Sequence, residues 1–341
     1  MSRWPIPELY CPFDQTADPE LADGADVSVR DWYRNLGLFQ AEQSDLRWHE
    51  QSKFGLLATL SYPDVVNFDY LVLGSQYLAM QNAMDDLFDD CQASHDVALV
   101  SGRLHSLIST LHEPLTVAGI DLEVTREPAC DPTLVAVLAA VRDVMERLGL
   151  IASPAQLGRA RRELIVLVSA WAEELAWRSQ QREPTLREYL AHRQRNGLTA
   201  SVAIADALGG YEVPPDEIES FPVRELIVMS SNIAMLINDL YPAEVESKAP
   251  TANYNLPSLL ARQGRTLENA LVEVGRIHDA ELRKYLKAER EVASSASPEL
   301  RRYLQSLRGW IRGNLDWSRR TARYKVEYRP AVDRNKVSSA I

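Results

Sequence analysis

Four carboxylates fall within six consecutive residues, 85–90 (DDLFDD), directly after the apolar stretch 68–84. On a helix, positions i and i+4 share a face, which would place Asp85 beside Asp89 and turn Asp86 about 100° away. Like charges at this spacing repel, and the C-terminal end of a helix disfavours them further. Clustered carboxylates suit Mg²⁺, above all when the ion is shared with a substrate phosphate. A solvated acidic turn is the alternative, because such runs also occur by chance in acidic proteins.

A second polar group follows the apolar stretch 226–237, where Glu246 comes eight residues after Asn238. Eight residues span about two helical turns, so both side chains would face one side if the helix continued. Pro242 lies between them and lacks the N–H that would bond the carbonyl of Asn238, so we expect the helix to kink or end there. An Asn at this place also suits a helix cap, and the motif alone decides nothing.

Two further motifs carry side chains that can bind a phosphate. Arg193, with Asn196 and Gly197 just after it, lies 45 residues before the first member of the second group. The pair Arg323-Tyr324 lies 85 and 86 residues after that member. A guanidinium is permanently charged and can donate two parallel hydrogen bonds to a phosphate.

The elements that must position these motifs are helices. Apolar residues recur at spacings of three and four, as in the stretch 134–148, and no segment alternates with a period of two. Breaks rich in Pro, Gly and Asn fall at 112–132, 153–156, 209–217 and 248–255. We expect an all-α fold with one catalytic domain over residues 27–341. Residues 1–26 contain four prolines and should form an extended arm or lid, because proline disrupts a helix interior.

The composition excludes several classes of protein. The 341 residues carry 37 Lys and Arg against 48 Asp and Glu, and this net charge of −11 argues against a nucleic-acid binder. Hydrophobic residues at 46% and charged residues at 25% are typical of a globular protein with a large core. The three cysteines form no CxxC pair, and we find neither a signal peptide nor an apolar run of about 18 residues. We therefore expect a cytoplasmic protein without a membrane span.

Taken together, the four motifs, in this order and at these separations, resemble the bacterial class I terpene synthases over essentially the whole chain. The resemblance implies a helical bundle in which an aspartate-rich motif and an Asn/Ser/Glu triad face each other across a cavity mouth and hold three Mg²⁺ ions. The implied metal ligands are Asp85, Asp89, Asn238 and Glu246. Asp86, and Asp90 likewise, would bond the arginines that bind the diphosphate.

The same resemblance gives roles to the basic motifs. Arg193 corresponds to the sensor of the diphosphate, Asn196 to the linker, and Gly197 to the effector whose backbone carbonyl approaches the nascent cation. Arg323 and Tyr324 correspond to the pair that grips the diphosphate when the site closes.

The chain departs from the family in the middle of its triad. Pro242 stands where a Ser or Thr ligand is usual, and Val245 stands where Lys is common. Three explanations remain open: a water replaces the hydroxyl, Asp239 or Glu244 is recruited instead, or metal binding there has been lost.

The implied reaction is the ionisation and cyclisation of a linear prenyl diphosphate. Mg²⁺ and arginines neutralise the departing diphosphate, and the cavity must exclude water from the cation. Trp310 and Trp317 are candidates to stabilise that cation through their rings, although each is also explained as an ordinary core aromatic.

Gln81 and Asn82 lie one turn before Asp85, where the family often has large aromatics. Either they line a roomy, polar cavity or they bond a neighbouring helix. The first reading slightly favours geranylgeranyl diphosphate over farnesyl diphosphate as the substrate. The other functions considered are a catalytically impaired protein that binds prenyl diphosphates or a partner, and a chain-elongating prenyltransferase. The resemblance also implies that the chain could pair as a homodimer.

Overall fold

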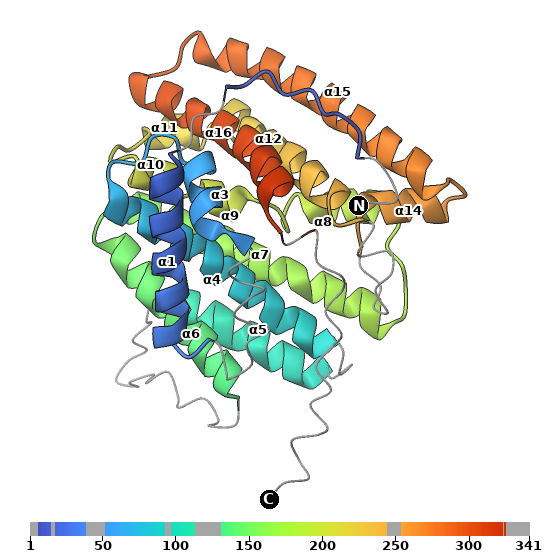
Figure 1. Ribbon diagram of the computed structural model, residues 1–341, viewed down its shortest axis with the longest axis horizontal. Coiled ribbons are helices and arrows are strands. Elements are labelled where there is room, and N and C mark those ends of the chain that lie inside the picture. Colours follow the sequence, from blue (N-terminus) through green and yellow to red (C-terminus); the bar gives the residue numbers. More distant parts are fainter. Residues whose placement is uncertain are drawn as a thin grey trace, which may run out of the picture.

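The computed structural model describes residues 6–14, 18–38, 52–92, 97–112, 131–243, 254–322 and 324, with the side chains of 89–92 excepted. Every regular element in this described part is a helix, as expected (Figure 1). The larger ones are α1 (Pro19–Asn35), α3 (Phe54–Ser61), α4 (Phe68–Gln92), α5 (Val97–Leu111), α6 (Pro132–Gly149), α7 (Pro154–Ser179), α12 (Phe221–Leu240), α15 (Leu267–Ala293) and α16 (Pro298–Arg320). The shorter ones are α8 (Leu186–Arg193), α9 (Thr199–Val202), α10 (Ala205–Leu208), α11 (Pro215–Ile218) and α14 (Leu256–Arg262).

The N-terminal arm is shorter than expected. Residues 6–14 are extended and lie beside α15, where the N–H of Tyr10 donates to Asp279 Oδ1 at 2.9 Å (Figure 1). The expectation that the arm continues to residue 26 is wrong, because α1 already begins at Pro19. Proline is tolerated in the first turn, where its missing donor is not needed, and Asp18 caps the N–H of Glu20 at 2.9 Å.

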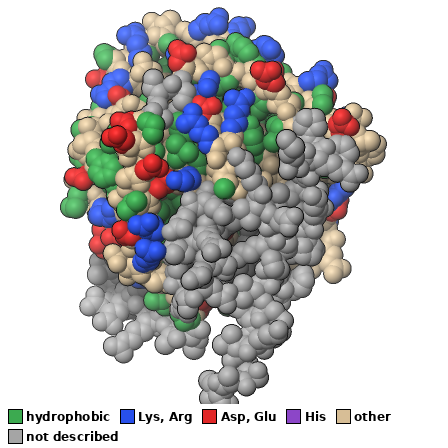
Figure 2. All heavy atoms as spheres, viewed as in Figure 1, with side chains coloured by type: hydrophobic (Ala, Val, Ile, Leu, Met, Phe, Trp, Pro, Cys, Tyr) green, Lys and Arg blue, Asp and Glu red, His purple; other side chains and the backbone are tan. Residues whose placement is uncertain are grey.

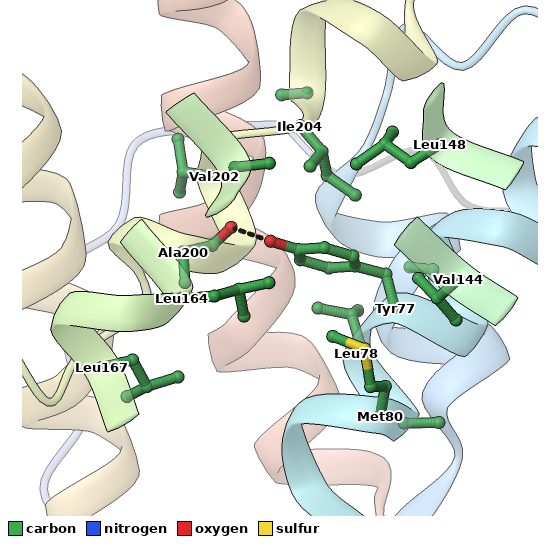
Figure 3. Close-up of a cluster of buried hydrophobic side chains, with 14 of the residues drawn as sticks. Tyr77, Leu78, Met80, Val144, Leu148, Leu164, Leu167, Ala200, Val202 and Ile204 are labelled. Atoms are coloured by element: carbon green, nitrogen blue, oxygen red, sulfur yellow. Dashed lines mark hydrogen bonds between the residues drawn. The ribbon is translucent and has the colours of Figure 1, made fainter. Parts of the chain in front are cut away.

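Buried side chains of several helices form the core that supports the site. Figure 3 shows part of it, with Tyr77 and Met80 of α4 packed against residues of α6, α7 and α9. Helices α3 and α16 approach closely, because a Cβ on Gly313 would stand 2.6 Å from the carbonyl oxygen of Leu60. Only glycine permits this contact, and it brings the long α16 against the centre of the bundle.

The described surface carries both signs of charge. In the view of Figure 2, acidic and basic side chains are interspersed over the part of the face that is described. None of the described helices is both long enough and apolar enough to cross a membrane.

The stretch between α8 and α10 is broken into short pieces. Helix α8 begins with a capping box between Thr185 and Glu188 and ends at Arg193. Five residues without helical structure follow before α9, which is only four residues long. Helices this short are unstable alone, so their position depends on the neighbouring elements.

Candidate active site

The aspartate group occupies the last turns of α4. Asp85 and Asp86 are partly buried, and the amide of Asn82 donates to Asp86 Oδ2 at 2.7 Å. Gln81 Oε1 accepts from Ser201 Oγ of α9 at 3.0 Å. For Gln81 the observed contact is therefore the bond to a neighbouring helix. The side chain of Asp89 lies outside the described residues.

Helix α12 ends at Leu240, two residues before Pro242, as the missing proline donor predicts. Asn238 in its last turn is partly buried, and its amide donates to the hydroxyl of Tyr324 at 2.9 Å. The structure thus joins the second polar group to the C-terminal motif. Arg323 and Glu246, the other expected members of these groups, lie outside the described residues.

Arg193, the expected sensor, is bound to the same end of α12. Its guanidinium pairs with the carboxylate of Asp239, donates from Nε to the hydroxyl of Tyr189 at 2.9 Å, and donates from Nη1 to the carbonyl of Asn196 at 3.3 Å. Burial lowers the pKa of Arg193, but Asp239 and then Tyr189 outweigh this and raise it above its usual range, so the side chain stays charged. This contact places a fixed positive charge against Asp239, the residue that follows Asn238 in the chain.

Asp239 is the most important site residue that sequence reasoning did not assign. Besides Arg193, its carboxylate accepts from the hydroxyl of Tyr189 and from the N–H of Leu256, the latter at 3.0 Å. Its exposed fraction is 2%. These partners argue against recruitment of Asp239 as the metal ligand that replaces the Ser or Thr at Pro242.

Asn196, the expected linker, is held by helix α7. Its amide donates to Glu174 Oε1 at 2.7 Å, and the same oxygen lies 2.7 Å from Nε2 of the buried His192. Burial raises the pKa of Glu174, but the hydrogen bond to His192 and the charge of Arg178 outweigh it and lower the pKa to about 2. A permanent carboxylate therefore orients the segment that follows Arg193.

Gly197 is pressed against α12. A Cβ at this position would stand 2.6 Å from Ser231 Oγ, and the neighbouring N–H of Leu198 donates to that oxygen at 2.7 Å. The next six carbonyls, of residues 198–203, all accept a hydrogen bond. Among the described residues, no donor reaches the carbonyl of Gly197 itself. The expected effector is therefore the one unengaged carbonyl of residues 197–203.

The two tryptophans expected to line the cavity are both buried on α16. Trp310 packs edge-on against Tyr62, with ring centroids 5.2 Å apart. Trp317 donates from Nε1 to the carbonyl of Ser52 at 2.6 Å and packs edge-on against Tyr324 at 5.6 Å. Trp317 thus has an evident structural role, and its ring also supports the tyrosine that contacts Asn238.

The oxygen donors in the described part fit a hard cation such as Mg²⁺, because carboxylates and amide oxygens are its preferred protein ligands. Of the four expected ligands, Asp85 and Asn238 lie in this part. Within the described residues, no three His, Cys, Asp or Glu side chains gather into a metal cluster. Asp89 and Glu246, two of the four expected ligands, are not described at the side-chain level.

Comparison with known proteins identifies the family. The sequence model of terpene synthase family 2, C-terminal metal binding, matches residues 76–284. The 2-methylisoborneol synthase of Streptomyces griseus is 30% identical over 94% of this chain and 73% of its own length. The chain belongs to the bacterial class I terpene synthase family. Its relatives also include the (+)-T-muurolol synthase of Streptomyces clavuligerus, 29% identical over 93% of this chain and 73% of that protein.

A solved structure of 2-methylisoborneol synthase from Streptomyces coelicolor A3(2), in complex with Mg²⁺ and 2-fluoroneryl diphosphate, has the same fold as this terpene synthase. The TM-score is 0.82 at 25% identity, and the match covers 95% of this chain and 98% of the other. The expected all-α class I terpene synthase fold is confirmed.

Proposed function

We propose that this terpene cyclase ionises farnesyl diphosphate with Mg²⁺ and closes the resulting cation into a cyclic sesquiterpene. The observation that carries the proposal is the contact of three motifs distant in sequence. Asn238 bonds Tyr324, the adjacent Asp239 holds Arg193, and the unengaged carbonyl of Gly197 lies four residues beyond that arginine.

The metal ligands in this proposal are Asp85, Asp89, Asn238 and Glu246. Bound Mg²⁺ supplies a Lewis acid that neutralises the departing diphosphate. In place of the missing Ser or Thr hydroxyl at Pro242 we propose a water or Glu244, because Asp239 is already engaged by Arg193, Tyr189 and the N–H of Leu256.

The chain's own polar groups then act on the diphosphate. Arg193 supplies a fixed guanidinium, and Tyr324 supplies a hydroxyl beside Asn238. Arg323 adds a second guanidinium next to this tyrosine. Asp86 takes part by bonding the arginines, and Asn82 orients it through its 2.7 Å bond. These groups hold the leaving group while it carries its negative charge.

The remaining groups act on the cation. The carbonyl oxygen of Gly197 offers a partial negative charge. The rings of Trp310 and Trp317 offer polarisable faces. A fixed dipole costs no reorganisation when the charge forms. The buried packing of these rings excludes water, which would otherwise quench the cation early.

The proposal also specifies the length of the prenyl chain of the substrate. The slight preference for geranylgeranyl diphosphate depended on Gln81 and Asn82 enlarging the cavity, but both side chains bond protein partners. Two relatives carry names that state farnesyl diphosphate cyclisation. A geranyl-type diphosphate is the second candidate, because crystal structures of a related synthase contain 2-fluorogeranyl and 2-fluoroneryl diphosphates.

The test is incubation of the purified chain with Mg²⁺ and, separately, geranyl, farnesyl or geranylgeranyl diphosphate, followed by gas chromatography and an assay for released diphosphate. We expect cyclic products and the fastest release with farnesyl diphosphate. Asp85→Ala should abolish both signals while leaving the helical circular dichroism unchanged. If the native protein turns over none of the three, a binding protein that has lost catalysis is the better description.

A further inference from the structure

Three buried tyrosines hold the short helix α9 by its backbone. Tyr77 of α4 donates to the carbonyl of residue 200 at 3.0 Å, and Tyr62, at the end of α3, donates to that of residue 201 at 2.8 Å (Figure 3 shows the first bond). Tyr303 of α16 donates to the carbonyl of residue 202 at 3.3 Å. Three different helical segments thus supply one hydroxyl each to three consecutive carbonyls.

These hydroxyls are permanent, neutral donors. The exposed fractions of Tyr62, Tyr77 and Tyr303 are 2%, 0% and 0%. Burial raises the pKa of each tyrosine above its ordinary value, because a phenolate would lose its hydration.

Side chains of other helices also bind the backbone at both ends of this segment. Arg159 donates from Nε to the carbonyl of Ala203 at 3.1 Å and pairs with the buried Asp206. At the other end, the N–H of Leu198 donates to Ser231 Oγ. The segment is therefore fixed from both sides, and the carbonyl of Gly197 is left without a donor in the described part of the chain.

We propose that Tyr62, Tyr77 and Tyr303 are positioning residues that determine which carbon of the cation the carbonyl of Gly197 meets. Loss of one hydroxyl would free a carbonyl of α9 and allow the helix to rotate. The carbonyl of Gly197 would then shift relative to the substrate. This inference rests on the proposed function, because it assumes that Gly197 faces the cation.

The test compares Tyr62→Phe and Tyr77→Phe with Tyr33→Phe as a matched control. Tyr33 is also buried, and its hydroxyl donates to a backbone carbonyl at 2.6 Å, but that carbonyl belongs to Ala79 of α4. All three variants lose one buried hydroxyl–carbonyl bond. We expect the ratio of main product to side products to fall about tenfold in the first two variants and to stay unchanged in the control. Diphosphate release should fall by less than about threefold in all three, since the phosphate-binding groups are intact.

The proposal is overturned if Tyr62→Phe and Tyr77→Phe give the native product ratio, or if Tyr33→Phe changes the ratio equally at a matched loss of melting temperature. An inactive native protein would instead refute the proposed function. If either variant fails to fold, Tyr303→Phe replaces it, because this substitution breaks the longest of the three bonds. The ratio of main product to side products is then judged in the same way.

Discussion

On the N-terminal side of Gly197 the chain is held by charged groups, whereas on its C-terminal side it is held mainly by neutral hydroxyls. Arg193 pairs with Asp239, and Asn196 donates to the carboxylate of Glu174. After Gly197, tyrosine hydroxyls bind three carbonyls in succession, and a charged pair returns only at carbonyl 203. The partners of the backbone thus change from charged to neutral at Gly197, whose carbonyl we propose to face the cation.

The difference follows from the charges that the reaction separates. A diphosphate requires fixed positive charge, and burying an arginine costs less free energy when a carboxylate compensates its charge. A carbocation requires an oriented dipole and the absence of strong nucleophiles. Changes on the charged side should therefore affect ionisation, and changes on the neutral side should affect the product ratio.

Loss of the charge on Arg193 should have the largest effect. In Arg193→Gln we expect diphosphate release to fall about 10²–10³-fold, because a donor to the leaving group is lost. Asp239 would keep a buried charge without its partner, at a cost of about 3–5 kcal/mol of unfolding free energy. Urea unfolding and a diphosphate-release assay measure the two effects. Adding Asp239→Asn should recover most of the stability but not the turnover, and recovered turnover would contradict the sensor role.

Removal of the amide of Asn238 should affect turnover alone. We expect Asn238→Ala to release diphosphate at least roughly 100-fold more slowly, because a metal ligand is lost, with an unchanged circular dichroism spectrum. Tyr324→Phe is the comparison variant, since it removes a hydroxyl that acts on the diphosphate and breaks the 2.9 Å bond to Asn238 but leaves the amide oxygen in place, so its loss of turnover should be smaller. Full activity in Asn238→Ala would show that the metal assignment on α12 is wrong.

The carboxylate of Glu174 should make stability depend on pH. Its pKa is lowered from 4.5 to about 2, so its contribution to stability is complete above about pH 4.5 and is lost as the pH falls toward 2. Glu174→Gln should cost on the order of 3 kcal/mol at pH 7 and nothing at about pH 2. Unfolding curves of both proteins at several pH values test this. The control is Glu173→Gln, whose side chain is 33% exposed against 16% for Glu174. A constant difference between native protein and Glu174→Gln across this range would contradict the role.

The smallest effect is expected at Pro242. Pro242→Ser restores the hydroxyl that the family usually has, and α12 already ends two residues earlier. We expect a change in stability within about 1 kcal/mol and retained turnover. The melting temperature measures the first effect and diphosphate release the second. Loss of the fold would show that the break in the helix at Pro242 is required for the structure.

The helical fold and the end of α12 were predictable because their signals are local. A period of three to four apolar residues predicts a helix, and Pro242 predicts the end of α12 wherever the rest of the chain lies. The arm was predicted for residues 1–26, and its end was placed too late. Four prolines outweighed the local signal of Asp18 before Pro19, which in fact starts α1.

The sequence by itself determined which residues carry charge, where helices stop, and which motifs are present. Tertiary structure alone decided that Asp239 compensates Arg193, 46 residues away, and that Tyr62 bonds a carbonyl 139 residues away. An aspartate beside a presumed metal ligand has the same sequence signal whether it binds a cation or an arginine. A tyrosine looks the same in the sequence whether its hydroxyl donates to water or to a backbone carbonyl. Only packing chooses between them, because burial makes each polar group require the partner that the fold brings to it.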